Sequence, residues 1–407
     1  MKILLVHNFY GSAAPSGENT AFEAERDLLR SGGHSVMEYT RHSDEIRSSG
    51  IWGALKGGLA TPWNPYSLSA VRRIIKKEKP DVMHVHNFFP LISPSIFYAA
   101  KGTATATVLT LHNYRVVCAY AIPMRDGSIC TECLDRRSTM PGLKYCCYRG
   151  SLAATLPLAA MIALHGKLGT WRKQVDAMIT LTGFQRDMLI KAGLPAGSMH
   201  IKPHFYRDAP APLPWKEREE KAVYIGRLSA EKGPEVMIEA WKRLGSSAPL
   251  LEVIGDGPDM ARLKDMIKGT SVEQRITFTG QLPFREAQVR LGRAKMLILP
   301  SLCFEGFPMV IREAFALGVP VAGSRLGSIP FIVTHAKNGM LFEPGDSAEL
   351  AGIAGMLQGN IDELGAMAAA ARREFDEKYT AGANLQTLIS IYETAMAVRQ
   401  GRNKGKA

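Results

Sequence analysis

Short apolar runs separated by longer mixed segments dominate the hydrophobic pattern of the chain. The runs are three to five residues long and rich in Val, Ile and Leu, which is typical of strands buried on both faces. Nine of them predict strands, at residues 3–6, 82–85, 108–111, 178–181, 222–225, 250–254, 276–278, 296–299 and 319–322. Because helix-length segments separate these strands, we expect an α/β fold with parallel sheets and helices on both faces.

One stretch divides the series of strands in two. Residues 208–221 hold three prolines and then six consecutive charged residues, a composition typical of an interdomain linker. We therefore expect a first domain over residues 1–207 and a second over residues 222–382. An apolar stripe over residues 383–398 predicts a last helix, and the basic residues 399–407 predict a disordered tail.

The net charge of +12 is unevenly distributed along the 407 residues. Residues 1–215 hold 25 Lys and Arg against 15 Asp and Glu, so the first half is the basic one. A basic surface attracts anionic lipid, nucleic acid or acidic substrates. No nucleic-acid-binding motif is present, which favours a membrane surface over nucleic acid as the partner. Surplus Lys and Arg that only keep the protein soluble remain the alternative.

No apolar run reaches the roughly 18 residues of a membrane-spanning helix. The longest candidate, residues 152–164, contains Pro157 and predicts either a core helix or a helix lying at a membrane interface. Residues 1–8 predict a strand and not a signal peptide. We therefore expect a cytoplasmic protein that is peripheral at the inner face of the cell membrane.

Two glutamates separated by seven residues form the most informative motif. Glu305 follows the strand at residues 296–299 and precedes a Gly-Phe-Pro turn, and Glu313 lies on the helix predicted over residues 309–317, about two turns along it. The N-terminus of a helix offers unpaired N–H groups and the positive end of its dipole. Such a loop is suited to binding phosphate.

A second candidate phosphate site follows the strand at residues 222–225. Arg227 and Lys232 lie five residues apart in the next loop, where a guanidinium and an ammonium can both reach a diphosphate. A solvated basic loop is the alternative reading. The glycines around Asp256 serve either the turn itself or a ligand.

Five of the six cysteines fall between positions 118 and 147. Cys130 and Cys133 have the two-residue spacing of a zinc knuckle, and Cys118 with Cys146, or Cys147 in its place, would complete a tetrahedral structural zinc site. Reduced thiols or a disulfide are the alternatives, and a cytoplasmic chain disfavours the disulfide. The sixth cysteine, Cys303, has no histidine near it in sequence and predicts loop packing.

The segment from Cys303 to Glu313 resembles the signature of retaining nucleotide-sugar glycosyltransferases of family 4. The string Leu-His-Asn-Tyr-Arg from Leu111 and the Cys-x-x-Cys pair resemble a subset of that family with a Cys-rich insert, here residues 118–147. The resemblance implies the GT-B fold, in which two Rossmann-like domains face a central cleft. It also implies a last helix that crosses back to the first domain.

The resemblance assigns roles residue by residue. Glu305 would lie beside the donor sugar, Glu313 would hold the ribose, and His112 would lie near the reaction centre. Gly17 stands in a Ser-Gly pair where the family has Gly-Gly against the donor diphosphate. The implied catalytic residues are Glu305 and His112, and the implied donor-binding residues are Gly17, Arg227, Lys232, Gly306, Phe307, Pro308, Met309, Val310 and Glu313. Of His84 and His86, we expect only one to face the cleft, and favour His86 as an acceptor-side residue.

These expectations define an enzyme. It would move a hexosyl group from a nucleotide diphosphate sugar to a polysaccharide or lipid-linked acceptor, with retention at the anomeric carbon, in bacterial cell-surface or exopolysaccharide synthesis. No strand ends in an Asp-x-Asp motif, so we expect catalysis without a metal cofactor. A sugar-nucleotide epimerase of the same fold and a non-catalytic basic binding protein are the alternatives.

Overall fold

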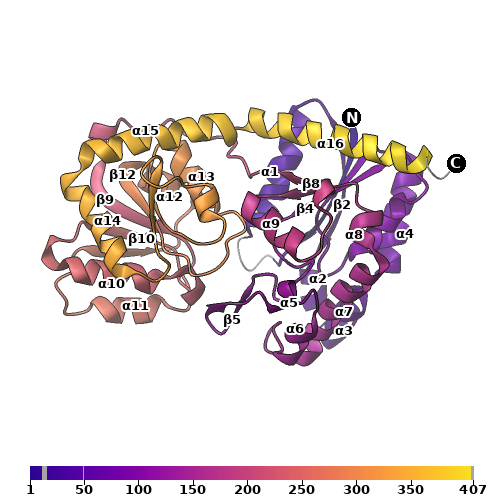
Figure 1. Cartoon of the computed structure of the whole chain (residues 1–407), viewed down its shortest axis with the longest axis horizontal. Helices are drawn as coiled ribbons and strands as arrows, with labels where there is room; N and C mark the ends of the chain where they lie inside the picture. Colours follow the sequence, from indigo (N-terminus) through magenta and orange to yellow (C-terminus); the bar gives the residue numbers. More distant parts are fainter. Residues whose placement is uncertain (12–15, 49, 405–407) are drawn as a thin grey trace. The chain divides into compact units, whose positions relative to one another are not determined.

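The computed structural model of the protein describes residues 1–11, 16–48 and 50–404, which form two compact units (Figure 1). The first unit takes residues 1–123 and 130–203 together with the C-terminal segment from Gly382. The second takes residues 124–129 and 204–381. The chain therefore returns to its first unit after completing the second.

A six-stranded parallel sheet forms the centre of the first unit, in the order β2-β1-β3-β4-β7-β8. Its strands are β1 (Lys2–Phe9), β2 (Ser35–His42), β3 (Val82–Asn87), β4 (Ala106–Leu111), β7 (Ala177–Thr180) and β8 (Met199–Ile201). Its helices are α1 (Gly17–Ser31), α2 (Asp44–Ser48), α3 (Gly50–Ala60), α4 (Pro65–Glu78), α5 (Glu132–Asp135), α6 (Met140–Lys144), α7 (Leu152–Leu168), α8 (Thr170–Lys173) and α9 (Gly183–Lys191).

The second unit repeats this plan with the strand order β11-β10-β9-β12-β13-β14, again parallel. Its strands are β9 (Glu219–Ile225), β10 (Leu250–Ile254), β11 (Ile276–Gly280), β12 (Ala294–Leu299), β13 (Val321–Ser324) and β14 (Gly339–Phe342), with a small hairpin of β5 (Met124–Arg125) and β6 (Ser128–Ile129). Its helices are α10 (Pro234–Leu244), α11 (Met260–Ile267), α12 (Phe284–Arg293), α13 (Met309–Ala316), α14 (Ser347–Gly359) and α15 (Ile361–Lys378). The predicted α/β class with parallel sheets is confirmed.

Every predicted strand is present, and five further strands of the described chain were not predicted: β2, β8 and β14 of the two large sheets, and β5 and β6 of the hairpin. β13 begins two residues later than expected, because the amide of Val319 closes the preceding helix on Ala314 and Pro320 has no N–H to donate. The predicted linker is also shorter than expected. Glu219 already belongs to β9, and the buried Arg218 donates to carbonyls of Leu317 and Gly318.

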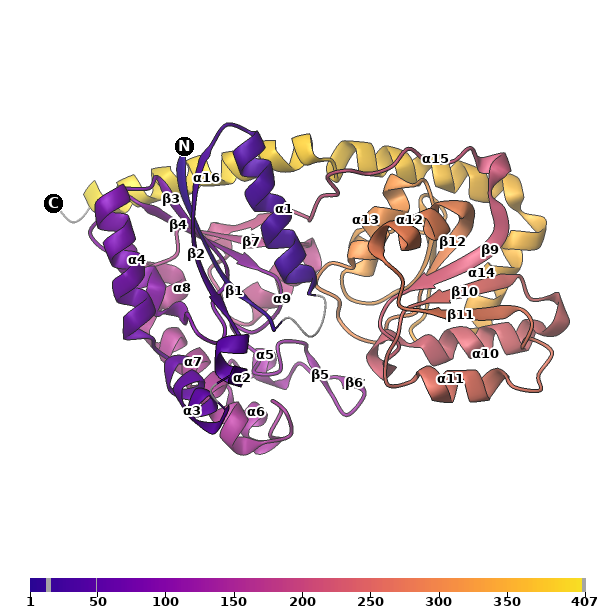
Figure 2. The same cartoon turned by 180° about the vertical axis from the view of Figure 1, so that it is seen from behind.

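The last helix, α16 (Ala381–Lys404), packs against the first unit, as predicted (Figures 1 and 2). Leu388, Ile391 and Tyr392 are buried in one hydrophobic cluster with Ile3 and Val82 of the sheet. This contact places the C-terminal segment in the same core as the first strand.

The expectation of a disordered basic tail from residue 399 is wrong through Lys404, where α16 ends; residues 405–407 lie outside the described part of the chain. Asp176, which is fully buried, accepts from Arg399 Nε at 2.8 Å and from Arg402 Nη1 at 2.9 Å. The same carboxylate accepts from the amide of Thr107 at 2.8 Å. The buried carboxylate of Asp176 thus pairs with Arg399 and Arg402, two of the basic residues that predicted a disordered tail. This pairing holds them in α16.

Replacing Asp176 with Ala should release the end of α16. It would leave Arg399, which is 4% exposed, as a buried charge without its partner, and breaking such a pair costs about 3–5 kcal/mol. We expect amide hydrogen exchange along α16 to accelerate at least a hundredfold. Asp376→Ala, which breaks the exposed pair with Arg372, is the control and should cost at most about 1 kcal/mol. Equal effects of the two variants would contradict the conclusion that Asp176 holds the end of α16 in place.

Candidate active site

In the second unit, a lysine and a glutamate from two loops form an ion pair. β9 and β12 are neighbours in the parallel sheet, so the loops that follow their carboxyl ends are adjacent. Lys232 Nζ, in the loop after β9, lies 2.7 Å from Glu305 Oε1, in the loop after β12. Ser301 Oγ donates to the same oxygen at 2.8 Å. The structure therefore brings together two residues that the sequence placed in separate motifs.

Lys232 keeps its charge in this position. Burial, the largest single effect, would by itself lower the pKa of Lys232, but the adjacent Glu305 carboxylate, together with Cys303 and Glu231, outweighs burial and raises it. An ammonium with three donors that gives one to Glu305 retains two for a ligand. Cys303, beside the pair, is 2% exposed, and burial raises the pKa of its thiol to about 12. That thiol is not a nucleophile at neutral pH.

Helix α13 begins beside this pair with its first turn uncapped by a side chain. Its N-cap residue is Pro308, which makes no side-chain cap hydrogen bond. Phe307 is buried and packs against His204 and Tyr379, which anchors the turn. Met309 and Val310 are half-buried. The backbone of this segment is thus fixed in place, and its first amides lie at the positive end of the helix dipole.

Glu313 is the fifth residue of α13, just over one turn from its start and not the expected two. Its Oε2 accepts from Gln288 Nε2 at 2.9 Å, and its Oε1 lies 3.9 Å from Arg312 Nη2. The residue is 8% exposed, and burial raises the pKa of its carboxyl. Gln288, on α12, is a neighbour that sequence reasoning did not single out.

The glycines of this region serve the architecture. A Cβ on Gly255, where φ is 141°, would overlap the carbonyl oxygen of Gly226, and one on Gly257 would overlap that of Leu228. The loops after β9 and β10 therefore approach backbone to backbone, which only glycine permits. Arg227 lies in this loop with its side chain exposed.

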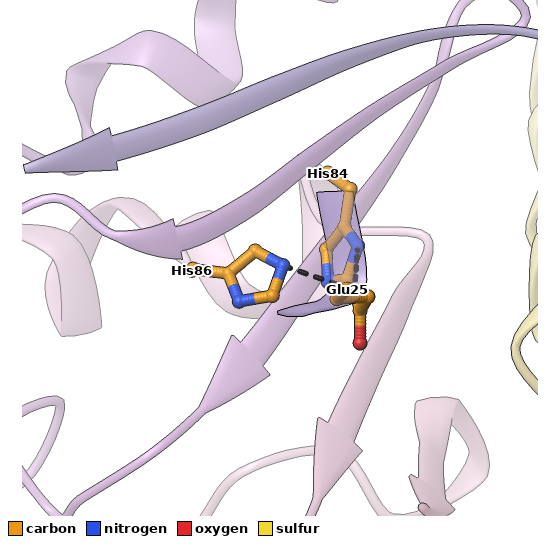
Figure 3. Close-up of side chains that lie close together, drawn as sticks. All are labelled: Glu25, His84 and His86. Carbon is orange, nitrogen blue, oxygen red and sulfur yellow. Dashed lines mark hydrogen bonds and ion pairs between the residues drawn. The ribbon is translucent and has the colours of Figure 1, made fainter. Parts of the chain in front are cut away.

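In the first unit, the expected histidines join a buried network around Glu25 of α1 (Figure 3). His112 Nε2 lies 3.2 Å from His86 Nδ1, and His86 Nε2 lies 3.0 Å from Glu25 Oε1. If His86 donates to the carboxylate, its other nitrogen must accept, which makes His112 the donor. The chain of bonds thus assigns the Nε2–H tautomer to His112.

His84 belongs to the same network, so the two histidines do not point to opposite sides of the sheet; that only one of them faces the cleft stays a prediction. Residues two apart in a strand point to the same side of the sheet, and His84 Nδ1 lies 3.2 Å from Glu25 Oε1. Its ring also bonds Tyr392 of α16 and Thr110 of β4, each at 2.8 Å. Both ring nitrogens are therefore occupied by protein groups.

A buried lysine completes the network. Lys202 Nζ, just after β8, lies 2.7 Å from Glu25 Oε2, and both residues are at most 3% exposed. Burial would raise the pKa of Glu25, but Lys202 and the two histidines hold it well below its ordinary value. Burial lowers the pKa of His84 to about 4. Sequence reasoning missed Glu25 and Lys202, because a charge on an amphipathic helix ordinarily faces water.

Among the described residues, Glu25, His84 and His86 are the one group whose ligand atoms lie close enough to hold a metal ion. The donor set does not favour a cation. Lys202 already supplies positive charge to Glu25, and the ring nitrogens of His84 are taken by Tyr392 and Thr110. We interpret the group as a hydrogen-bonded network.

Gly17 lies in the first turn of α1, after the N-cap residue Ser16. A Cβ at Gly17 would meet nothing within 4 Å, so a side chain at this position would not clash with the rest of the described chain. Next to it, Glu18 accepts from Asn113 Nδ2 at 2.6 Å, beside His112. Residues 12–15 of the predicted phosphate loop lie outside the described part of the chain.

The cysteines of the insert lie near one another without forming a tight cluster. In the described chain no disulfide joins them, and no three of their sulfur atoms lie within 4.8 Å of one another. Cys147 raises the pKa of both Cys118 and Cys133, after burial as the main cause. The thiol of Cys146 instead points to the carbonyl of Leu143. Of the two alternatives for the fourth ligand, the structure favours Cys147.

The shifted pKa of His84 predicts an acid-sensitive first unit. The unfolded chain takes up a proton near pH 6.5, whereas the folded protein resists it down to about pH 4. The free energy of unfolding should therefore fall as the pH drops through this window, by up to about 3 kcal/mol from this residue. We expect His84→Gln to have a lower free energy of unfolding than the wild type at pH 7.5. Between pH 7.5 and 5 this free energy should fall less in the variant than in the wild type, as measured by urea unfolding. An equally steep fall in the variant would refute the assignment of the acid sensitivity to His84.

Comparison with known proteins places this geometry in a family. The chain matches the model of "Glycosyltransferase Family 4" over residues 22–206 and that of "Glycosyl transferases group 1" over residues 206–373. It is 29% identical over 236 residues to the amylovoran biosynthesis glycosyltransferase AmsK of Erwinia amylovora, covering 54% of this chain and 56% of AmsK. The chain spans about half the length of several curated relatives that it matches.

Two further similarities extend over more of the chain. A 2-deoxystreptamine N-acetyl-D-glucosaminyltransferase of Streptomyces fradiae is 25% identical over 366 residues, covering 86% of this chain and 79% of that protein. HepE of Anabaena, solved in complex with UDP, superposes with a TM-score of 0.66 over 97% of this chain and 100% of HepE, at 17% identity. Two parallel-sheet units and two consecutive family models lead to one conclusion: the chain belongs to the family 4-like glycosyltransferases and has the GT-B fold.

Proposed function

We propose that the protein transfers a hexosyl group from a nucleotide diphosphate sugar to a polysaccharide or lipid-linked acceptor, with retention at the anomeric carbon. One observation carries the proposal: the Lys232–Glu305 ion pair lies beside the uncapped N-terminus of α13. This arrangement combines a cation, a carboxylate and free amides. Such a set suits a diphosphate attached to a sugar.

The diphosphate is the leaving group in this reaction, so the main task of the site is to stabilise charge that develops on it. Lys232, Arg227 and the first amides of α13 would supply fixed positive charge and hydrogen bonds, which is electrostatic catalysis. No metal ion is needed in this scheme. Family resemblance further implies that the departing phosphate takes the acceptor proton on the same face.

We assign Glu305 to positioning the donor sugar. Its Oε1 already accepts from Lys232 and Ser301, so the carboxylate is held in one orientation. Glu313, held by Gln288, would accept from the ribose hydroxyls. In the first unit, His112, whose Nε2–H is given to His86, would accept at Nδ1 beside the sugar and would be oriented by His86 and Glu25.

HepE was solved with UDP and with UDP-glucose, so uridine nucleotides are the first donors to test. AmsK takes part in amylovoran biosynthesis, which supports an acceptor in exopolysaccharide synthesis at the inner face of the cell membrane. A sugar-nucleotide epimerase of the same fold is the second candidate. It would consume the donor without acceptor and return an epimer.

We further propose that Cys118, Cys130, Cys133 and Cys147 bind a structural zinc ion. Four thiols of one short insert support it: Cys133 and Cys147 contribute to the raised pKa of Cys118, and Cys147 and Cys130 contribute to that of Cys133. Their sulfur atoms lie farther apart than a zinc tetrahedron requires, so binding would have to draw them together. The ion would brace the insert and take no part in the transfer.

Removing either cation of the donor site should weaken nucleotide binding. A charge-assisted hydrogen bond is worth roughly 1.5–3 kcal/mol, so Arg227→Ala and Lys232→Ala should each lower the affinity for UDP at least tenfold. Glu313→Ala should also weaken UDP binding, and Glu305→Ala should reduce turnover more than binding. Calorimetric titration and thermal shift with UDP, GDP and their sugars measure these effects.

Lys242→Ala is the matched control. It removes the same charge from the second unit, but Lys242 lies in the last turn of α10, whereas the Lys232 loop precedes the first residue of this helix. UDP affinity should be unchanged in this variant. Unaltered affinity in both Arg227→Ala and Lys232→Ala would exclude the donor site. The anomeric configuration of the product, read by NMR, decides between retention and inversion.

The zinc proposal is tested by two neighbouring variants. Protein purified under reducing conditions with zinc supplied should carry about one equivalent, and chelation should lower its melting temperature. Cys147→Ser should lose the metal, whereas Cys146→Ser should keep it. Wild-type protein that carries no zinc while all its thiols titrate freely would overturn the assignment.

A further inference from the structure

Two neighbouring helices of the first unit expose large apolar side chains to solvent. On α3, Trp52 is 74% exposed and Leu59 is 77% exposed, with Leu55 between them. On α7, Leu152 and Leu156 are each 55% exposed. Positions three and four apart share one face of a helix, so each helix presents an apolar stripe. We call these five residues the α3–α7 surface.

The two stripes belong to one region of the molecule. Figures 1 and 2 both show α3 and α7 side by side at the end of the first unit. A Cβ on Gly58 of α3 would lie 3.6 Å from the ring of Pro157 on α7, so the helices are in contact. Monomeric soluble proteins rarely expose clustered apolar side chains of this size without a partner.

The charge of the chain is concentrated around the same helices. Residues 46–77 hold six Lys and Arg, residues 136–175 hold seven, and neither segment holds an Asp or Glu. Together they carry a formal +13, whereas the whole chain carries +12. The rest of the protein is therefore close to neutral. α3, α6, α7 and α8 lie within these two segments, and α4 lies within them except for its last residue, Glu78.

A cavity of about 730 Å³ opens at the C-terminal end of α7. Its rim carries the cations of Arg137, Lys167, Arg172 and Lys173, and no carboxylate lines it among the described residues. Its walls include the apolar side chains of Val117, Ile162 and Trp171. The exposed face of α7 runs from Leu152 through Ala163 to Lys167, so the apolar stripe leads into this cavity.

We propose that the α3–α7 surface inserts into the interfacial layer of an anionic membrane and that the adjoining cavity receives the phosphate head group of one of its lipids. Apolar side chains flanked by cations bind in this way without spanning the bilayer. Of the described residues, no helix is long and apolar enough to span a membrane. The proposal rests on the proposed function only for its biological purpose, which is to hold the enzyme beside a lipid-linked acceptor.

Flotation with vesicles tests the membrane contact directly. Wild-type protein should float with vesicles of phosphatidylglycerol and phosphatidylcholine, float poorly with phosphatidylcholine alone, and detach as salt is raised. Leu59→Glu and Leu156→Glu should each weaken binding to the mixed vesicles at least tenfold. Val289→Glu, at a residue 55% exposed in the second unit, is the matched apolar control and should float like the wild type. Equal flotation of the wild type and both Leu variants would overturn the proposal.

The head-group site needs a separate measurement. Short-chain dihexanoyl phosphatidic acid, used as a soluble probe, should bind the wild type at least tenfold more tightly than the Arg172→Glu/Lys173→Glu variant. Lys264→Glu/Lys268→Glu, an equal charge change in the second unit, should leave binding unchanged. Inorganic phosphate binding as tightly as the short-chain lipid would show a free-phosphate site and remove the lipid from the proposal.

Failure of this inference can be told apart from failure of the proposed function. Lys232→Ala should lose nucleotide binding and yet float with anionic vesicles as the wild type does. A protein that binds UDP and ignores anionic vesicles keeps the donor site and loses the membrane surface. A protein that floats with anionic vesicles and binds no nucleotide keeps the membrane surface and loses the donor site.

Discussion

The buried carboxylate of Glu25 is the group on which the arrangement of the first unit depends. It joins α1, where it resides, to the end of β3 through His84 and His86 and to the chain after β8 through Lys202. His84 carries the connection on to Tyr392 of α16. Desolvating these charges is costly, so each is stable only because the others are present. The same bonds orient His112, and the fold and the candidate chemistry of this unit therefore share one network.

The second unit uses a paired charge for a different purpose. Glu25 is satisfied by protein groups on both oxygens, whereas the Lys232–Glu305 pair is partly exposed and its ammonium has hydrogen bonds left to donate. A fully compensated network fixes geometry, and an incompletely compensated one can receive a ligand. This difference in completeness separates the structural charges of the molecule from those suited to binding a diphosphate.

The sequence predicts those parts of the fold in which local pattern decides the outcome. Buried central strands such as β1 and β12 contain continuous apolar runs, but β2, at a sheet edge, mixes polar and apolar residues, and β8 is three residues long, so neither gives a run. Glu305 and Glu313 belong to a local motif that can be recognised. Glu25 and Lys202 lie 177 residues apart, and His84 and Tyr392 lie 308 apart, so only the folded topology brings them together. The basic end of α16 was predicted to be disordered for the same reason: its partner, Asp176, lies 223 residues from Arg399 in the sequence.

Helix α7 bears out one reading of its apolar pattern, as a core helix, and leaves the other, as an interfacial helix, a prediction. A helix that is apolar on every face is ordinarily buried throughout or spans a membrane. α7 has 17 residues, and its inner face, including Leu158 and Met161, is buried in the core of the first unit. Its outer face keeps Leu152 and Leu156 in water, in a stretch of sequence, residues 136–175, that holds seven Lys and Arg and no Asp or Glu. Core packing explains only half of the helix, and the proposed anionic interface would account for the apolar outer face and for the positive charge.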